Sequence, residues 1–391
     1  MNARSRLFLL LAMPACGSVI AEPTRPDASV SDSATPPPVG DAATADSDAA
    51  VCASGKPSRE CFDEASMKAM FAPGRGGDVG GDAAVVIPPD AYDPSGCVAM
   101  KYAQNGCCNP AVTPGERVGD KCCYTFCTGS CCGRPLYVGG EARVAPLVAR
   151  RDWCGRCGPG LALSREPGDP SLREALARGF AADALMEHAS IASFSRFALE
   201  LLAFGAPPAL VRDAHEAALD EVEHARVTFA LASRFAAGPV GPGRLDVAGV
   251  TPAATLEAAV VAAVREGCVG ETIAAILAEE AAAVAVDPEC RDALEAIAAD
   301  EARHAELAWR FVAWALDEDA QLGGAIERAF EDALAHDLPG LDGCDDPRVR
   351  HYGRLTAGDR ARLAASVASG VIGPCAARLL DTAGRQSAVA A

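Results

Sequence analysis

After residue 168, apolar side chains recur every three or four positions, which is the period of amphipathic α-helices. Asp169-Pro170 and Asp287-Pro288 have the composition of helix starts, with proline in the first turn. Residues 205–208 and the glycine- and proline-rich run at 238–243 interrupt the pattern. The spacing predicts helices over residues 169–204, 209–236, 252–285 and 287–319, a shorter helix that ends near 336, and a further helix over 359–380.

The four long helices are predicted to form two hairpins. A short turn joins the first helix to the second, another joins the third to the fourth, and a longer connection over 238–251 links the hairpins. Two antiparallel hairpins joined by a long crossover predict an all-α four-helix bundle over residues 169–320. The remaining residues, 321–391, are predicted to form a C-terminal helical extension.

Two six-residue stretches in this region, 220–225 and 300–305, nearly repeat each other. Residues three apart in a helix share a face, so a Glu-x-x-His motif aims a carboxylate and an imidazole in the same direction. Each stretch contains one such motif: Glu221 with His224, and Glu301 with His304.

One further glutamate interrupts the apolar stripe upstream of each motif, Glu187 before the first and Glu271 before the second. All of these groups lie about fifteen to nineteen residues from the turn of their hairpin. At a rise of about 1.5 Å per residue, the six side chains are predicted to meet at one height in the core.

Four buried carboxylates would repel one another and are costly to desolvate, whereas two divalent cations would cancel their charge. Oxygen-rich ligands with two imidazoles suit Fe(II) or Mn(II). Asp220 and Asp300 are either partners that orient an imidazole or solvated helix charges. The small residues near Glu271 are predicted to leave an open pocket there: Gly267, Gly270, Ala274 and Ala275.

The order Glu, Glu-x-x-His, Glu, Glu-x-x-His on four successive helices resembles the ferritin-like di-iron carboxylate superfamily, which includes rubrerythrins, bacterioferritins and di-iron oxidases and oxygenases. The resemblance covers about residues 170–320 and implies an all-α ferritin-like four-helix bundle that holds two iron ions, with manganese as the alternative. It implies terminal glutamate ligands, bridging glutamates and terminal imidazoles, which are respectively Glu187 and Glu271, Glu221 and Glu301, and His224 and His304.

The N-terminus is predicted to direct export. Two arginines precede a short apolar run over 7–15 that ends at Cys16, which resembles a bacterial lipoprotein signal with a lipidated cysteine. An ordinary secretory signal cleaved near Ala21 is the alternative. Residues 17–50 hold few large apolar side chains and are predicted to be a disordered tether. No later segment is predicted to span the membrane, so the chain is expected to contact the membrane only through the lipid anchor. The predicted location is the cell envelope, at the outer membrane.

Twelve of the seventeen cysteines lie between Cys52 and Cys157, and this density is typical of disulfide-stapled segments in an oxidising compartment. Residues 51–160 are therefore predicted to form a small, irregular or β, disulfide-rich domain in which each cysteine doublet bonds in two directions. Cys154 and Cys157 favour a structural disulfide over a redox dithiol or an iron knuckle. Cys344 with Cys375 is a further candidate pair, and Cys268 is not expected to bond to Cys290.

The net charge of −18 argues against a nucleic-acid partner, because phosphate binding requires clustered Lys and Arg. Three functions remain open. The first is a di-iron oxidoreductase that uses O₂ or peroxide with an unknown electron donor. The second is an iron-oxidising or iron-storing protein. The third is a non-enzymatic envelope protein whose bundle is stabilised by metal. A homo-oligomer is compatible with each.

Overall fold

The structure is a computed structural model of the 391-residue chain. It describes residues 57–62, 95–97, 115–127, 134, 136–138, 141–154, 167–236, 238–336 and 346–390. The predicted signal peptide with Cys16 and the predicted tether over 17–50 lie outside the described residues, as does much of the cysteine-rich segment.

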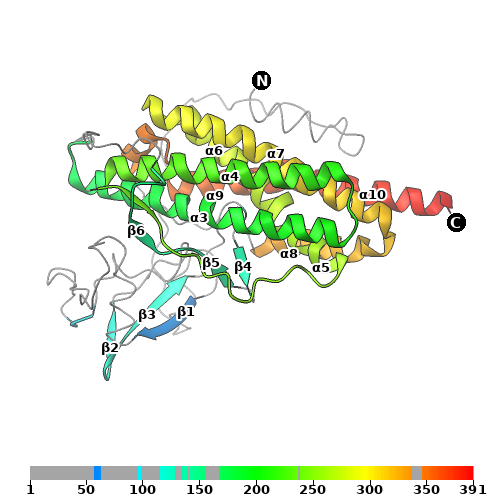
Figure 1. Cartoon of the computed structure of the whole chain (residues 1–391), viewed down its shortest axis with the longest axis horizontal. Helices are drawn as coiled ribbons and strands as arrows, with labels where there is room; N and C mark the ends of the chain where they lie inside the picture. Colours follow the sequence, from blue (N-terminus) through cyan, green and yellow to red (C-terminus); the bar gives the residue numbers. More distant parts are fainter. Residues whose placement is uncertain are drawn as a thin grey trace, which may run out of the picture.

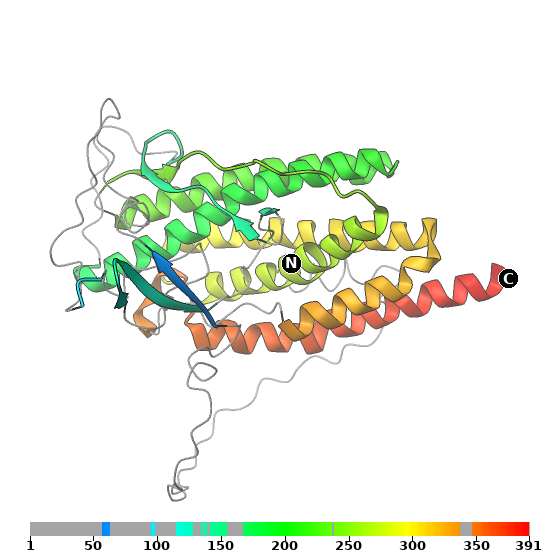
Figure 2. The same cartoon turned by 90° about the horizontal axis from the view of Figure 1, so that it is seen from below.

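The described chain is mostly helical, with a few short strands. The two hairpins of long helices lie side by side in both views (Figure 1, Figure 2), and α4 of the first packs against α7 of the second. They comprise α3 (Pro170–Ala203), α4 (Pro208–Phe235), α5 (Leu256–Ala263), α6 (Thr272–Val284) and α7 (Pro288–Glu318).

The helix boundaries follow the local signals. The side chain of Asp169 accepts a hydrogen bond from Ser171 N (2.9 Å) and caps α3, while Asp287 accepts one from Cys290 N (3.0 Å) and caps α7. Gly205, with a φ of 71°, follows the end of α3 in the left-handed conformation that glycine adopts without strain. These ends lie within about two residues of the predicted ones.

The prediction of one continuous α-helix over 252–285 is wrong. Between α5 and α6 the chain forms a π-helical segment, Val264–Glu271, in which hydrogen bonds close five residues apart instead of four. The wider turn changes which side chains share a face. As a result, both Glu266 and Glu271 are buried, although five residues separate them.

The strands in the described part of the chain form three small antiparallel sheets. In the first, β3 (Lys121–Cys127) lies between β1 (Pro57–Phe62) and β2 (Glu116–Val118). The second pairs β4 (Leu136–Val138) with β5 (Glu141–Arg143). The third pairs β6 (Leu147–Ala149) with β7 (Val240–Pro242), which belongs to the connection between the two helical hairpins. This pairing attaches the cysteine-rich segment to the helices.

The cysteine doublet in β3 bonds in two directions, as predicted. Cys122 is bonded to Cys97, and Cys123 is bonded to Cys61 on β1. Cys154 is also disulfide-bonded, whereas Cys157 lies outside the described residues. These bonds indicate an exported protein, because disulfides persist in oxidising compartments.

The buried cysteines of the helices agree with one prediction and contradict another. Cys268 and Cys290 are both buried thiols and are not bonded to each other, as expected. Cys375 is also a buried thiol that forms no disulfide, so the prediction of a Cys344–Cys375 bond is wrong.

The C-terminal extension shares its core with the long helices. Its buried side chains Phe330, Ile372 and Leu379 belong to the same apolar cluster as Phe311 of α7. The extension comprises α8 (Gly323–His336), α9 (Ala357–Val367) and α10 (Gly373–Ala390), with short 3₁₀ turns at Ala320–Leu322 and Pro347–Tyr352 and a π turn at Ala368–Ile372.

One helical stretch within the described residues, Ala357–Asp381, has the length and apolar composition to cross a membrane, which the sequence analysis did not expect. Its most apolar window has a mean hydropathy of 1.5, and 39% of that window is buried inside the structure. Val367, Ile372 and Leu379 of this stretch contribute to the protein core. A core helix of a soluble protein meets the same criterion, so the finding is weak support for a membrane span.

Candidate metal centre

The six predicted ligands come together between the long helices. Their ligand atoms form two groups, and within each group the atoms lie within 4.8 Å of one another. Two glutamates, Glu221 and Glu301, belong to both groups. Glu187 and His224 complete the first group, and Glu271 and His304 complete the second. The arrangement is that of two neighbouring sites that share a pair of carboxylates.

The cage is closed except at one residue. The side chains of Glu221, Glu301 and both histidines are almost fully buried, and Glu271 is completely buried. Glu187 differs, because 20% of its side chain is exposed. Solvent or a small molecule therefore reaches the cage most easily beside Glu187.

Both imidazoles point the same nitrogen into the cage. His304 Nδ1 lies 3.2 Å from a Glu221 carboxylate oxygen, and His224 Nδ1 lies 3.5 Å from one of Glu301. Each histidine therefore faces the shared glutamate of the opposite helix, so the two halves of the site are related by an approximate twofold exchange of α4 and α7.

The two aspartates that precede the motifs hold the outer nitrogens. His224 Nε2 lies 3.1 Å from Asp300, and His304 Nε2 lies 3.2 Å from Asp220. Of the two alternatives for these aspartates, the structure supports that of imidazole partners. An ionised carboxylate can only accept, so Nε2 carries a proton, and Nδ1 is the nitrogen that can bind a metal ion once its own proton is lost.

Arg303 ties the two aspartates together at the surface of the cage. Its guanidinium donates to Asp220 (2.8 Å) and also to Asp300. One arginine thus fixes both partners of the imidazoles. The sequence analysis missed this residue, although its position inside the second Glu-x-x-His motif is visible in the sequence.

The pKa values of several groups in the cage lie far from their usual ranges. Burial and the neighbouring carboxylates raise the pKa of Glu187 and of Glu271 well above the ordinary glutamate value. Burial alone would lower the pKa of His304, but hydrogen bonds to Asp220 and Glu221 outweigh it and raise this pKa to about 9. Cations that enter the cage must therefore displace protons.

Several ligand atoms are buried and have no hydrogen-bond partner among the residues that the structure describes. They include both oxygens of Glu271, one oxygen of each shared glutamate, and Nδ1 of each histidine. Orphaned polar atoms are costly in a protein interior, and here they converge on one point. The buried Glu and His clusters could therefore hold metal ions, and the oxygen-rich donor set with two imidazoles fits that purpose.

A buried arginine from the cysteine-rich segment lies beside the cage. Arg134 lies over the rings of Phe194 and Phe197, with its guanidinium carbon 4.8 and 4.3 Å from the ring centroids. The ring of Phe194 in turn contacts His304, with centroids 4.9 Å apart. The cysteine-rich segment is thus in contact with the residues that surround the site.

Arg134 also contacts the π-helical segment that carries Glu271. Its Nε lies 3.4 Å from Glu266, which Arg196 of α3 approaches to 3.2 Å. Ser190 of α3 donates a hydrogen bond to the Arg134 carbonyl (2.9 Å). Sequence reasoning missed both Arg134 and Glu266, because one arginine among cysteines and one glutamate in a helix carry no local signal of this contact.

The expected open pocket at Gly267 is absent. A Cβ atom at this position would collide with the Cβ of Ala308 on α7. Gly267 therefore permits the close approach of α7, which brings Glu301 and His304 to the cage, and its lack of a side chain is a packing requirement.

Two other candidates belong to neither ligand group. His188 packs edge-on against Trp153, with ring centroids 5.0 Å apart. Cys268 is buried, and burial raises the pKa of its thiol well above the usual value, so it is a poor metal ligand.

No protein-family model, curated protein or solved structure matches this chain. Any assignment to a family therefore depends on the residues of the site alone.

Proposed function

We propose that the protein is a member of the ferritin-like di-iron carboxylate superfamily, with α3, α4, α6 and α7 as its four-helix bundle, and that it acts as an exported oxidoreductase using O₂ or peroxide. One observation carries the proposal: six ligand residues form two overlapping groups that share Glu221 and Glu301. Shared carboxylates are expected where two cations lie side by side, whereas a site for a single ion has no use for them.

The residues of the cage would have different roles as metal ligands. Glu221 and Glu301 would hold both ions, while Glu187 with His224 and Glu271 with His304 would each complete one position. A bound pair of iron ions would supply two-electron chemistry with O₂ or peroxide. The four carboxylates balance the charge of two divalent cations, which favours retention of a pair.

The partly exposed ligand supports a reaction with small molecules. Glu187 is the one residue of the six whose side chain is as much as 20% exposed, and it belongs to the first group alone. The first position would therefore be the one that small reactants reach, while the second position, at Glu271, stays closed. An external electron donor would complete the cycle.

The proposal is tested by iron loading of the full chain purified without oxygen. We expect two Fe(II) per chain and, on addition of O₂, ferric-oxo absorption in the near ultraviolet. Glu221→Gln should reduce bound iron below one per chain, because both positions lose a ligand. Glu223→Gln is the matched control on the same helix, since its side chain is 62% exposed and pairs with Arg226.

The outcomes separate the alternatives. Repeated O₂ consumption with two irons per chain supports an oxidoreductase, whereas uptake of many irons would indicate storage. Two irons that remain bound in the Glu221→Gln variant would contradict the proposed site. A structural metal site would be indicated by two results together: the wild type consumes no O₂ or peroxide, and the Glu221→Gln variant is less stable than the wild type.

We also propose that the chain is anchored to the envelope through a lipid on Cys16. The disulfides support export, and the lipoprotein-like sequence before Cys16 supports the anchor. Cys16→Ala should move the protein from the membrane fraction to the soluble fraction of the envelope. Membrane association that persists in this variant would instead favour insertion of the apolar Ala357–Asp381 stretch.

A further inference from the structure

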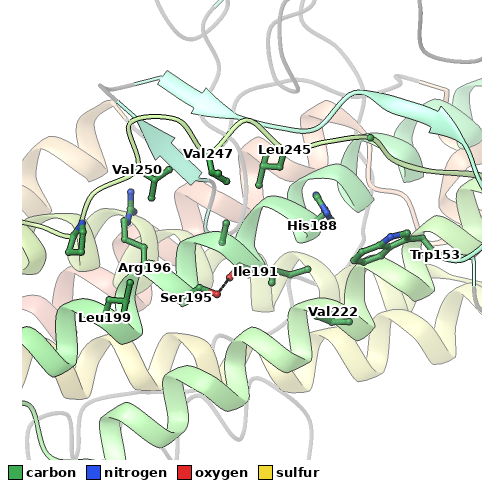
Figure 3. Close-up of a pocket in the computed structure, with 13 residues that line it drawn as sticks. Trp153, His188, Ile191, Ser195, Arg196, Leu199, Val222, Leu245, Val247 and Val250 are labelled. Atoms are coloured by element: carbon green, nitrogen blue, oxygen red, sulfur yellow. Dashed lines mark hydrogen bonds between the residues drawn. The ribbon is translucent and has the colours of Figure 1, made fainter. Parts of the chain in front are cut away.

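A groove of about 600 Å³ lies on the outer side of α3, and none of the six ligand residues lines it. Figure 3 shows its parts: the exposed face of α3 forms the floor, the segment over 243–252 forms the roof, and Trp153 closes one end. This volume falls within the range of pockets that bind small organic molecules.

The roof is anchored at both ends. At the first end β7 pairs with β6, and Arg150 donates a hydrogen bond to the Pro242 carbonyl (2.8 Å). At the second end Ala253 N donates to the buried carboxylate of Glu200 on α3 (2.9 Å). A connection that only had to link two hairpins would not need these contacts. The groove is therefore preformed, which lowers the entropic cost of binding.

The walls of the groove are apolar. Ile191, Leu199 and Val222 contribute from the helices, and Leu245, Val247 and Val250 contribute from the roof. Leu199 and Val247 remain 56% exposed, so apolar surface faces solvent on both sides of the groove. An apolar occupant would cover this surface and would be held by the hydrophobic effect.

Two polar side chains of the lining, those of Ser195 and Arg196, are engaged elsewhere. Ser195 donates to the Ile191 carbonyl (2.7 Å), and Arg196 donates to the Tyr137 carbonyl (2.8 Å) and contacts Glu266. The imidazole of His188 has no hydrogen bond to any residue in the part of the chain that the structure describes, and its buried Nδ1 is without a partner. The imidazole of His188 is thus available for a hydrogen bond, and so is the indole N–H of Trp153, which donates to no residue that the structure describes.

We infer that this groove binds a small, neutral organic molecule with a flat ring and one hydroxyl group, the ring lying among the apolar walls beside Trp153 and the hydroxyl bonding to His188. The charge of Arg196 is already paired, so an anionic ligand gains nothing there. The inference is independent of the proposed function, because none of the six cage residues lines the groove.

The test is equilibrium binding of 1-naphthol to the full oxidised chain, followed by the fluorescence of the probe. Naphthalene, which lacks the hydroxyl, and 1-naphthoate, which carries a charge, are the comparison probes. We expect one 1-naphthol per chain, bound about tenfold more tightly than either comparison probe, since one hydrogen bond to a buried partner is worth about this factor.

Three variants locate the site. Val247→Arg places a charge in the groove and should weaken 1-naphthol binding at least tenfold. Leu219→Arg is the matched control, because Leu219 is a 68% exposed apolar residue of α4 that does not line the groove, and it should bind as the wild type does. His188→Leu should remove the preference for 1-naphthol over naphthalene while leaving naphthalene binding intact.

Three results would overturn the inference: no saturable binding of 1-naphthol, equal weakening by Val247→Arg and Leu219→Arg, or tighter binding of 1-naphthoate. Equal weakening by the two variants would mean that the probe binds nonspecifically to apolar surface, or that the whole face is a protein contact surface. The binding assay does not use iron, so a protein that fails to load metal should still bind 1-naphthol. The Val247→Arg variant should bind as much iron as the wild type.

Discussion

Replacing Arg134 with methionine tests whether the cysteine-rich segment is energetically part of the helical core. Only 2% of the Arg134 side chain is exposed, and its ion-pair partner Glu266 is 6% exposed. Methionine keeps much of the apolar volume over Phe194 and Phe197 but removes the charge. The variant therefore isolates the electrostatic contribution of the contact.

Removal of one partner of a buried ion pair costs about 3–5 kcal/mol, because the other charge stays buried. Arg196 remains 3.2 Å from Glu266 and still balances its charge, so we expect the lower end of this range. Loss of the contact with two aromatic rings contributes about 1 kcal/mol more, and the new apolar contacts of methionine offset a similar amount. The expected loss of unfolding free energy is about 3 kcal/mol, or more than a hundredfold in the unfolding equilibrium.

The assay is urea unfolding of the full oxidised chain, followed by circular dichroism. Arg134→Lys should lose less than Arg134→Met, because lysine keeps the charge but not the planar stacking. Arg226→Met is the control, since this exposed arginine pairs with the exposed Glu223 and should change stability by less than about 0.5 kcal/mol. If Arg134→Met also loses less than about 0.5 kcal/mol, the contact does not stabilise the fold and the reasoning is refuted.

Three further predictions concern the cage, the pH dependence and helix packing. Asp300→Asn should weaken Co(II) binding by about 10- to 100-fold in equilibrium dialysis, because it disturbs the orientation of His224. The hydrogen bonds of Arg234 lower the pKa of Asp287 to about 2, so this pair stabilises the fold above pH 3.8 and is lost as the pH falls through about 2. Wild type should therefore lose about 1–2 kcal/mol of unfolding free energy between about pH 5 and 2.5 that Asp287→Asn does not lose. Gly267→Ala should lower the unfolding free energy by about 1–3 kcal/mol, because the new methyl group collides with Ala308. Adding Ala308→Gly should restore part of this free energy.

Each of these predictions has a result that would contradict it. Unchanged Co(II) affinity in the Asp300→Asn variant would mean that the imidazole is oriented by other contacts. Parallel pH profiles of wild type and Asp287→Asn would remove the pair with Arg234 as a cause of acid sensitivity. A Gly267→Ala protein as stable as the wild type would show that α7 can move away without cost.

The convergence of the six cage residues was predictable because it depends on local geometry. The helical period places Glu221 and His224 on one face, as it does Glu301 and His304, and the constant rise per residue sets their height. The turns at 205–208 and 285–287 then bring the heights together. None of these steps requires knowledge of side-chain packing.

The surroundings of the cage were not predictable in the same way. The roles of Asp220 and Asp300 stayed open, because a charge near a helix face pairs or remains solvated depending on which helix lies opposite. The π-helical segment was missed, because its sequence differs little from that of an α-helix and its wider turn is stabilised by contacts of Glu266 with residues far away in the chain.

The sequence by itself determined the long helices α3, α4 and α7, their order and the placement of Glu-x-x-His on inward faces, since these follow from periodicity within each segment. Only the tertiary structure decided that Arg134 reaches the core, that Gly267 is a contact point for α7, and that the segment over 243–252 covers a groove on α3. These features join residues distant in sequence, and the free energy that selects them comes from burial and ion pairing across elements, which no local pattern encodes.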